Sequence, residues 1–524
     1  MKLAILHYHL NRGGVSRVIQ SQLEALESQF AGGDEMLVLL LYGGRREGWP
    51  EDWAQRFRSL RVILEAAPLA DYDNVHKNTS LKAADLLYGQ LLEALRRHGC
   101  RPEETVLHVH NHSLGKNGAW PAVLLRLAEA GYPILLQIHD FAEDFRPGNY
   151  RAILQHRPGR PGWTSQQCLY PQAEHLHYAV LNRRDKQLLE HAGLPSERLH
   201  LTPNPVVGLG ELPTAEAAKR RLQKIFEIPR RDRYLLYPVR AIRRKNLGEA
   251  VLCGLLAGPS CWLGVTLAPL NPGEKRWYEG WKRWTAQHRL GCVWETGEKS
   301  RLSLADNLAA ADALLSTSIA EGFGMVFLES WLVGRMLVGR NLPEITRDFC
   351  CLGLRLPGMW HRLAVPLDWL GAERVRKRIL ESYQQVLTAY QRPMQPDWTE
   401  ALDEKLADGS VDFGDLDEAF QQEILEKILL EKSGFRRRRR QLLEENPLLG
   451  SALWGRQEEQ EALIGQNGQV VREHFSPICL GRQLCQIYQT LFQARRSGPL
   501  EPLAHPERIL EGFLDLRRFR MLRT

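Results

Sequence analysis

The sequence has no long uninterrupted apolar segment, although 44% of its 524 residues are hydrophobic. A membrane-spanning helix needs about 20 consecutive, predominantly apolar residues, and no stretch approaches that length. The N-terminal stretch MKLAILHYHLNRGG has one lysine and only a short apolar run, which differs from a secretory signal. We therefore expect a soluble protein whose contact with a membrane is at most peripheral.

Paired cysteines are also missing from the sequence. The nine cysteines are an odd number, none forms a C-x-x-C pair, and Cys350 and Cys351 are adjacent. This spacing fits neither a disulfide framework nor a zinc site, so a reducing cytoplasm is the predicted location. We expect no metal cofactor.

The excess of positive charge is small. Sixty-nine lysine and arginine residues against 62 acidic residues give a formal net charge of +7. This balance does not indicate a nucleic-acid-binding protein. It suits an anionic small molecule or weak contact with an anionic membrane surface.

The chain is too long for one ordinary hydrophobic core, which predicts two domains with an extension. Apolar runs alternate with amphipathic segments over residues 1–205, and again over 206–365 after Pro203-Asn204-Pro205. This alternation predicts an α/β fold with two doubly wound Rossmann-like domains that face a cleft. The expected strands are Leu3–His7, Met36–Tyr42, Val106–His110, Ile134–His139, Tyr178–Leu181, Leu199–Thr202, Tyr234–Val239, Trp262–Leu267, Cys292–Trp294 and Ala313–Ser316.

The C-terminal third has a different pattern. Residues 366–466 contain long stretches rich in Leu, Glu, Gln and Arg, which predict a helical insertion. Residues 467–524 are expected to form closing helices and a basic tail. We interpret the run Arg436–Arg440 as a solvated helix face or loop; contact with anionic lipid or with an acceptor is the alternative.

The segment EGFGMVFLE, from Glu321 to Glu329, follows the strand-like ADALLSTS. A strand, a glycine-containing loop and a helix that begins near Gly324 present backbone amides and a positive dipole end, which favour phosphate. Gly322 and Gly324, on either side of Phe323, permit close approach of a ligand. Glu321 suits sugar hydroxyls and Glu329 suits ribose hydroxyls. Two solvent-facing glutamates on an amphipathic helix are the alternative.

A second motif lies in YPVRAIRRKNLGEAV, which leads from the first strand of the second domain into a helix. Arg240 and Lys245 lie at the carboxyl end of that strand, where cations are well placed to bind a diphosphate. We interpret Arg243 and Arg244 as solvated.

The spacing Arg240-x4-Lys245 followed by Glu321-x7-Glu329 resembles the donor-binding signature of retaining glycosyltransferases of family 4 (glycosyl transferases group 1), which have the GT-B fold. Other pieces resemble the family in the same order. They are the glycine loop Gly13-Gly14-Val15, the histidine-bearing strand end QIHDF at 137–141, the linker PNPV at 203–206 and the closing helices NGQVVREHFS…LCQIYQTLF. The resemblance covers residues 1–345 and 467–492, and the helical insertion departs from the family pattern.

The resemblance implies a donor that is a uridine-, guanosine- or adenosine-diphosphate sugar. It implies that Arg240 and Lys245 stabilise the leaving diphosphate without a metal, while Glu321 contacts the donor sugar and Gly14 the phosphate region. His139 corresponds to a histidine near the donor sugar and acceptor; a buried histidine at a strand end is the alternative. The family's mechanism is usually drawn as front-face displacement, in which the departing phosphate oxygen takes the acceptor's proton.

The first domain is expected to bind the acceptor. HVHNHSLGKNG places His108, His110 and His112 at alternate positions, which we interpret as an acceptor site or packing rather than a metal site. HDFAEDFRPGNYR adds groups that suit a phosphorylated or carboxylated acceptor, although Arg146 pairing with Asp144 at the surface is equally open. The candidate acceptor residues are His112, Lys116, Asp140, Arg146, Asn149, Tyr150 and Arg151.

Two other functions fit the same architecture. A nucleotide-sugar epimerase or hydrolase would consume the donor without an acceptor. A non-catalytic sugar-binding scaffold would keep the fold and use the arginine run as a docking surface. The sequence does not specify the base, the sugar, the acceptor or the oligomeric state.

Overall fold

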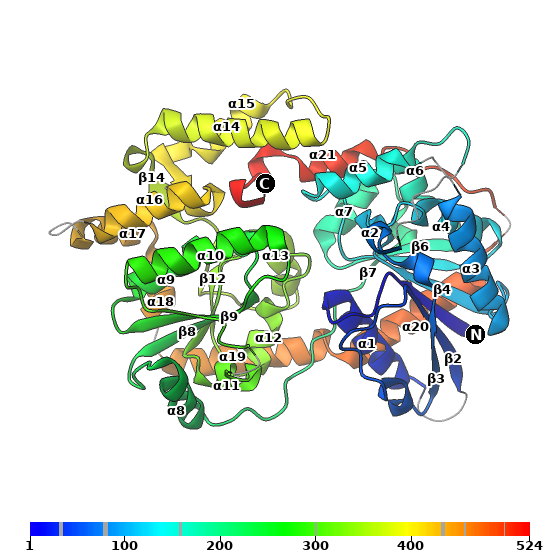
Figure 1. Cartoon of the computed structure of the whole chain (residues 1–524), viewed down its shortest axis with the longest axis horizontal. Coiled ribbons are helices and arrows are strands. Elements are labelled where there is room, and N and C mark those ends of the chain that lie inside the picture. Colours follow the sequence, from blue (N-terminus) through cyan, green and yellow to red (C-terminus); the bar gives the residue numbers. More distant parts are fainter. Residues whose placement is uncertain are drawn as a thin grey trace. The chain divides into compact units, whose positions relative to one another are not determined.

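The computed structural model describes residues 1–30, 35–76, 82–156, 160–298, 301–430, 435–454, 457–496 and 498–523. The chain forms two compact units (Figure 1). The first contains Met1–Pro205, Ala389–Gln391 and Phe475–Leu514, and the second contains Val206–Thr388, Arg392–His474 and Asp515–Thr524. None of the helices in the described segments has both the length and the apolar composition that crossing a membrane requires.

The first unit is built on a seven-stranded parallel sheet in the order β3-β2-β1-β4-β5-β6-β7. Its strands are β1 (Lys2–His7), β2 (Met36–Tyr42), β3 (Leu60–Ala66), β4 (Thr105–His110), β5 (Ile134–Ile138), β6 (Leu176–Val180) and β7 (Leu199–Leu201). Its helices are α1 (Gly14–Glu27), α2 (Asp73–His76), α3 (Ala83–Arg97), α4 (Trp120–Glu129), α5 (Pro147–Gln155), α6 (Ser165–Leu169), α7 (Arg183–His191), α20 (Pro477–Gln493) and α21 (Glu507–Phe513).

The second unit has a six-stranded parallel sheet in the order β10-β9-β8-β11-β12-β13. Its strands are β8 (Arg233–Arg240), β9 (Cys261–Leu267), β10 (Cys292–Trp294), β11 (Ala313–Ser316), β12 (Leu337–Arg340) and β13 (Met359–Trp360). The helices that alternate with them are α8 (Ala215–Phe226), α9 (Leu247–Ala257), α10 (Pro272–Gln287), α11 (Leu304–Ala310), α12 (Val326–Leu332) and α13 (Pro343–Cys351).

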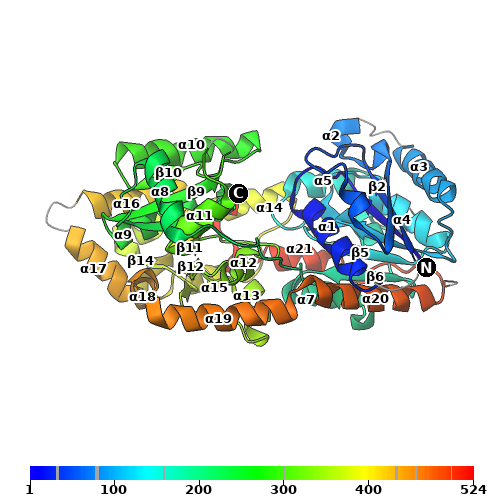
Figure 2. The same ribbon diagram turned by 90° about the horizontal axis from the view of Figure 1, so that it is seen from below.

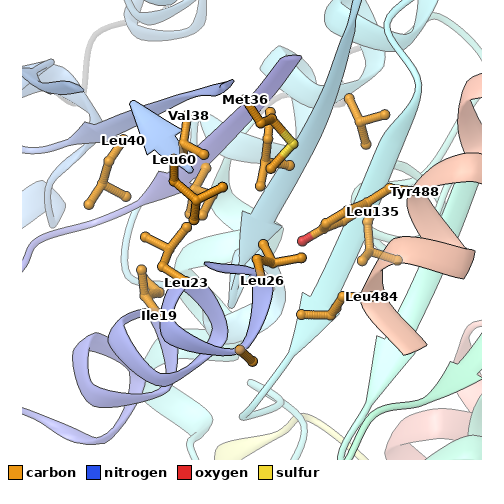
Figure 3. Close-up of a cluster of buried hydrophobic side chains, with 14 of the residues drawn as sticks. Ile19, Leu23, Leu26, Met36, Val38, Leu40, Leu60, Leu135, Leu484 and Tyr488 are labelled. Carbon is orange, nitrogen blue, oxygen red and sulfur yellow. The ribbon is translucent and has the colours of Figure 1, made fainter. Parts of the chain in front are cut away.

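The hydrophobic core of the first unit shows why helix and sheet form together (Figure 3). Ile19, Leu23 and Leu26 lie on one face of α1 and are fully buried against the sheet. Burial of each such side chain contributes about 1.5–3 kcal/mol. The C-terminal helix α20 packs beside α1, and Gly481 permits this approach because a Cβ there would lie 2.3 Å from the carbonyl oxygen of Ala25.

Residues 366–466, which were predicted from sequence as a helical insertion, are largely helical in the part that the structure describes. They belong almost entirely to the second unit and include β15 (Ser410–Asp412), which pairs antiparallel with β14 (Ala364–Pro366). The helices are α14 (Ala372–Ala389), α15 (Trp398–Lys405), α16 (Glu418–Leu429), α17 (Phe435–Glu445), α18 (Pro447–Trp454) and α19 (Gln457–His474). Figure 2 shows α17, α18 and α19 in succession along this unit.

A buried ionic network explains why this region belongs to the second unit. Arg340, at the end of β12, is fully buried and donates to both carboxylate oxygens of Glu249 and both of Asp412. Near the C-terminus, Arg520 donates to Asp412 and Asp415 at 3.0 and 3.2 Å. Residues 515–523 therefore belong to the second unit, whereas α20 and α21 belong to the first.

The arginine run is only partly solvated, which corrects the expectation from sequence. Arg437 and Arg440 are exposed on α17, but Arg438 donates to the carbonyl of Lys427 at 3.0 Å. Arg439 donates to the carbonyl of Leu256 at 2.5 Å. Since α16 and α9 end near these carbonyls, the two arginines satisfy acceptors that helix ends leave open.

Candidate functional site

The two motifs of the second domain meet at the carboxyl ends of neighbouring strands. The loop after β8 contains the short helix η5 (Arg243–Lys245), and the loop after β11 contains Glu321. Because β8 and β11 are parallel partners, their carboxyl ends lie at the same edge of the sheet. Ligands of doubly wound sheets bind at this edge.

Two cations hold the carboxylate of Glu321. The Lys245 ammonium donates to Oε1, and Arg244 donates to Oε2 at 3.0 Å. The side chains of Lys245 and Glu321 are 14% and 9% exposed, so solvent screens this interaction little. Burial alone would raise the pKa of Glu321, but Lys245 and Arg244 lower it to about 2. Glu321 is therefore an anion at neutral pH beside an excess of positive charge.

Hydrogen bonds from β8 and from the loop after β11 fix the position of the Lys245 loop. Tyr237 donates its hydroxyl to the Lys245 carbonyl at 2.8 Å and lies 3.0 Å from the Ser318 hydroxyl. Thr317 donates to the carbonyls of Lys245 and Asn246 at 3.1 and 3.0 Å. These residues were not predicted from sequence, although the polar run Thr317-Ser318 directly after an apolar strand is a signal for them.

Arg243 and Arg244 are not the solvated residues expected from sequence. Arg243 makes a bidentate pair with Glu418 at 2.6 and 2.7 Å, and its guanidinium lies 4.4 Å from the centre of the Trp277 ring. Arg244 and Lys245 together bring two positive charges to the single negative charge of Glu321. Arg240 forms no ion pair with any described residue.

The rest of the glutamate motif lies around Gly324. Its φ of +79° is left-handed, and a Cβ there would lie 2.5 Å from the Phe327 ring, so the position requires glycine. The helix consequently begins at Val326, two residues later than expected. Glu329 is exposed on this helix, Phe323 is buried, and Gly322 is half-buried. Arg240 is exposed and donates to the carbonyl of Ala268 at 2.9 Å.

In the first unit, His139 follows β5 and is 8% exposed. Its backbone N–H donates to the side-chain oxygen of Asn111 at 3.1 Å, as does the N–H of Asp140 at 2.8 Å. Asn111 has a left-handed φ of +64°, which turns the chain after β4 toward the end of β5. Burial lowers the pKa of His139 to about 4, so its imidazole is neutral at pH 7. Gly14 is exposed at the first position of α1.

Several candidate acceptor residues make internal contacts. His112 is 1% exposed and donates Nε2–H to the carbonyl of Leu169 at 3.1 Å. Tyr150 is buried with its hydroxyl bonded to Gln166, and Asn149 donates to the carbonyl of Leu114 at 2.8 Å. Arg151 is exposed on α5. The interior position of His112 and Tyr150 favours packing over direct contact with a ligand.

Arg146 pairs mainly with Asp140. Its guanidinium donates to Asp140 at 2.6 Å and lies 3.9 Å from the carboxylate of Asp144. The contact between Arg146 and Asp144, which the sequence left open, is therefore present but longer than the contact with Asp140.

Glu143 is a buried carboxyl next to Asp144 that was not predicted from sequence. Burial raises the pKa of Glu143 to about 7, and the Tyr170 hydroxyl lies 3.2 Å from both of its carboxyl oxygens.

Lys116 is exposed and forms no ion pair with any described residue. Its ammonium lies 5.8 Å from the centre of the Tyr72 ring, and the guanidinium of Arg45 lies 5.4 Å from the same ring. Partial desolvation and the nearby Arg146 lower the pKa of Lys116. Arg45 itself makes a bidentate pair with Asp71 at 2.5 and 2.6 Å. Lys116 is thus a cation whose charge is not neutralised locally.

Two parallel Rossmann-like sheets with helices on their faces define the GT-B fold of glycosyltransferases. Solved structures with this likeness include HepE from Anabaena in complex with UDP and glucose (TM-score 0.53, 11% identity, 94% of this chain and 100% of HepE). Sucrose-phosphate synthase from Thermosynechococcus elongatus is similar (TM-score 0.52, 14% identity, 94% and 99% of the two chains). At these identities, the likeness establishes the fold.

No protein-family model matches the chain. A curated relative is mannosylglucosyl-3-phosphoglycerate synthase from Petrotoga mobilis, which is 28% identical over 359 residues. The match covers 66% of this chain and 66% of that protein, just under two thirds of each. The chain is therefore a homologue of a glycosyltransferase.

Proposed function

We propose that the protein is a retaining glycosyltransferase of family 4 that transfers a sugar from a nucleotide-diphosphate sugar to an anionic small-molecule or glycan acceptor without a metal. One observation carries the proposal. Lys245 and Glu321, which lie 76 residues apart in the two motifs, contact each other at the carboxyl ends of adjacent strands. The homology to a glycosyltransferase supports the same conclusion.

Arg240 and Lys245 bind the diphosphate of the donor in this proposal. The negative charge on the diphosphate grows as the bond to the sugar breaks, so cations at this point stabilise the transition state more than the ground state. Each charge-assisted hydrogen bond contributes about 1.5–3 kcal/mol, which is more than tenfold in rate. The positive charges of Arg240 and Lys245 stabilise the diphosphate as a divalent metal ion does in metal-dependent enzymes.

Glu321 accepts hydrogen bonds from hydroxyls of the transferred sugar, and Glu329 accepts them from the ribose. The low pKa of Glu321 supports the role of acceptor, because a carboxylate that stays ionised has no proton to donate. The backbone from Gly322 to Gly324 lies beside the phosphates in this proposal. Gly14 and His139 of the first unit stay predictions from the family resemblance, for the phosphate region and the donor sugar.

The chemistry is front-face displacement. The bond from the anomeric carbon to the leaving phosphate oxygen breaks while the acceptor hydroxyl oxygen attacks the same face. The acceptor proton passes to the departing phosphate oxygen, so the products are a glycoside with retained configuration and a nucleoside diphosphate. The protein stabilises charge and positions the reactants, and no covalent intermediate is needed.

The acceptor in this proposal carries a phosphate or carboxylate. The name of the Petrotoga relative specifies a product that joins mannosyl, glucosyl and 3-phosphoglycerate groups. Glucosyl-3-phosphoglycerate is therefore the first acceptor to test, with GDP-mannose as the first donor. Lys116, which has no ion pair among the described residues, is the group we assign to the acceptor's negative charge. Asp140 and Arg146 lie close by for its hydroxyl and acidic groups.

The test is a panel of UDP-, GDP- and ADP-sugars with glucosyl-3-phosphoglycerate, 3-phosphoglycerate and neutral sugars as acceptors. Mass spectrometry detects the product, and NMR assigns its anomeric configuration. The proposal predicts acceptor-dependent transfer with retention that persists in excess EDTA. Donor consumption at the same rate without any acceptor would instead indicate an epimerase or hydrolase, and loss of transfer in EDTA would remove metal independence.

A further inference from the structure

Three histidine rings, those of His108, His110 and His139, stack in a row in the first unit. His108 and His110 lie on β4, and both are at most 1% exposed. The rings of His108 and His110 stack with centroids 4.2 Å apart, and those of His110 and His139 stack at 5.3 Å. His110 therefore lies between the other two, and it connects the interior of the unit to His139.

The inner end of this row is fixed by groups from distant parts of the chain. His108 Nδ1 lies 2.8 Å from the hydroxyl of Tyr488 on α20, and its Nε2 lies 2.9 Å from the side-chain oxygen of Gln137 on β5. Gln22 on α1 also donates to this oxygen, at 2.7 Å. With both of its ring nitrogens engaged, His108 is a rigid surface against which His110 stacks.

The outer end of the row determines how His139 can meet a ligand. His110 Nδ1 lies 3.0 Å from His139 Nε2, so one of these two nitrogens carries the shared proton. Nε2 of His139 is thereby occupied, and Nδ1 is the ring nitrogen left for a ligand. The proton state of that Nδ1 depends on which histidine donates.

The other nitrogen of His110 decides between the two arrangements. His110 Nε2 is buried and has no hydrogen-bond partner among the described residues. If His139 were the donor, neutral His110 would carry its proton on Nε2, and that N–H would have no acceptor. A buried N–H without an acceptor is rarer in proteins than a buried lone pair without a donor. The geometry therefore favours His110 as the donor.

We infer that His110 is a positioning residue that donates its Nδ1–H to His139 and holds His139 as the Nδ1–H tautomer. His139 then meets the transferred sugar as a hydrogen-bond donor to a hydroxyl oxygen and does not act as a general base. The role toward the sugar rests on the proposed function, whereas the tautomer rests only on the geometry of the first unit. No proton is lost or gained by the pair.

The tautomer can be observed directly and without activity. Protein labelled with ¹⁵N at its histidines gives two-bond proton–nitrogen correlations that distinguish Nδ1–H from Nε2–H, and the His139→Asn variant assigns the His139 signals. We expect protonated Nδ1 and unprotonated Nε2 at His139 in the intact chain. Protonated Nε2 at His139 would overturn the inference, even if the protein proved to be a glycosyltransferase. If the Nδ1–H form is seen but no donor is turned over, the proposed function fails and the tautomer stands.

Variants test the positioning role in the enzyme. His110→Asn keeps an N–H donor near the position of Nδ1, whereas the similarly sized His110→Leu removes it. We expect kcat to change less than about threefold in the Asn variant and to fall about tenfold in the Leu variant, the scale of one hydrogen bond. Equal losses in both variants would contradict the assignment. His175→Gln, at a buried histidine bonded to the carbonyl of Ala128, controls for loss of a buried imidazole.

A second pair of variants tests His139 itself and does not depend on the folding of the His110 variants. The amide nitrogen of His139→Asn lies near the position of Nδ1, and that of His139→Gln lies near Nε2. The Asn variant is expected to keep at least about tenfold more kcat than the Gln variant. The reverse order would show that Nε2 serves the ligand and would overturn the inference.

Discussion

The ammonium group of Lys245 donates directly to the carboxylate of Glu321. The two residues are 76 positions apart in sequence, and each lies in the loop after one of two neighbouring parallel strands, β8 and β11. Arg244 donates to the second carboxylate oxygen. The two cations lower the pKa of Glu321 to about 2 in spite of its burial, so the group is ionised throughout the physiological range.

Replacement of Lys245 or Glu321 is expected to lower the rate of transfer strongly while leaving the fold intact. Lys245→Met removes a charge-assisted contact to the diphosphate, and Glu321→Gln removes the carboxylate that accepts from sugar hydroxyls. Each loss is expected to lower kcat/KM more than tenfold, from about 1.5–3 kcal/mol of transition-state stabilisation. Steady-state kinetics with thermal unfolding as a fold check provide the measurement.

Arg376→Gln is the matched control for these variants. Arg376 is 34% exposed, as is Arg244, and pairs with one carboxylate, that of Asp403 at 2.6 Å. Its loss is expected to change kcat/KM less than about twofold, because an exposed ion pair contributes at most about 1 kcal/mol. Wild-type turnover by Lys245→Met or Glu321→Gln would remove the proposed donor site.

Arg244→Gln is expected to make activity sensitive to acid. Removal of one cation raises the pKa of Glu321 from about 2, because Lys245 alone then offsets the effect of burial on the carboxylate. Protonation of the carboxylate then begins at a higher pH, so the ratio of kcat/KM at pH 5 to that at pH 7.5 is expected to fall relative to the unaltered chain. An unchanged ratio would mean that Arg244 does not act through Glu321.

Arg340→Met is expected to destabilise the second unit strongly. The side chain of Arg340 is fully buried between Glu249 and Asp412, and its loss leaves two buried carboxylates without their cation. Breaking a buried pair in this way costs about 3–5 kcal/mol. Denaturant unfolding measures the effect, with Arg376→Gln again as the control. A loss below about 1 kcal/mol would contradict the role of this network.

Much of the sheet topology follows from the sequence. Runs such as Met36–Tyr42 and Ala313–Ser316 are continuously apolar because parallel strands are covered on both faces, and the structure has strands with these bounds. The edge strand Leu60–Ala66 was missed because Arg61 and Glu65 interrupt its apolar pattern. The strand Leu337–Arg340 was missed because it is short and ends in a buried arginine, whose partners come from distant segments.

The candidate site is predictable to a more limited extent. Arg240, Lys245, Glu321 and Glu329 were predicted from their spacing and from the family resemblance, and the structure brings Lys245 and Glu321 into contact. The pairing of Arg244 with Glu321 and the contact between His110 and His139 depend on which strands become neighbours. Local sequence carries no information on such pairs, nor does it show that His108, His110 and His112 are all buried.

The buried histidines are expected to make stability fall in acid. Burial lowers the pKa of His7 and His108 to about 3 and that of His139 to about 4, from an ordinary value of about 6.5. Between these values the unfolded chain binds more protons than the folded one, so the free energy of unfolding rises with pH. From pH 5 to 7 each histidine adds about 2 kcal/mol. Urea unfolding at the two pH values tests this, and pH-independent stability would contradict it.

The most direct measurement is the release of nucleoside diphosphate from a nucleotide-sugar by the purified protein, with and without glucosyl-3-phosphoglycerate. The account predicts release that depends on the acceptor, equals the amount of glycosylated product and falls more than tenfold in Lys245→Met. It is contradicted if none of the UDP-, GDP- and ADP-sugars gives acceptor-dependent release, or if Lys245→Met releases the diphosphate as fast as the unaltered chain.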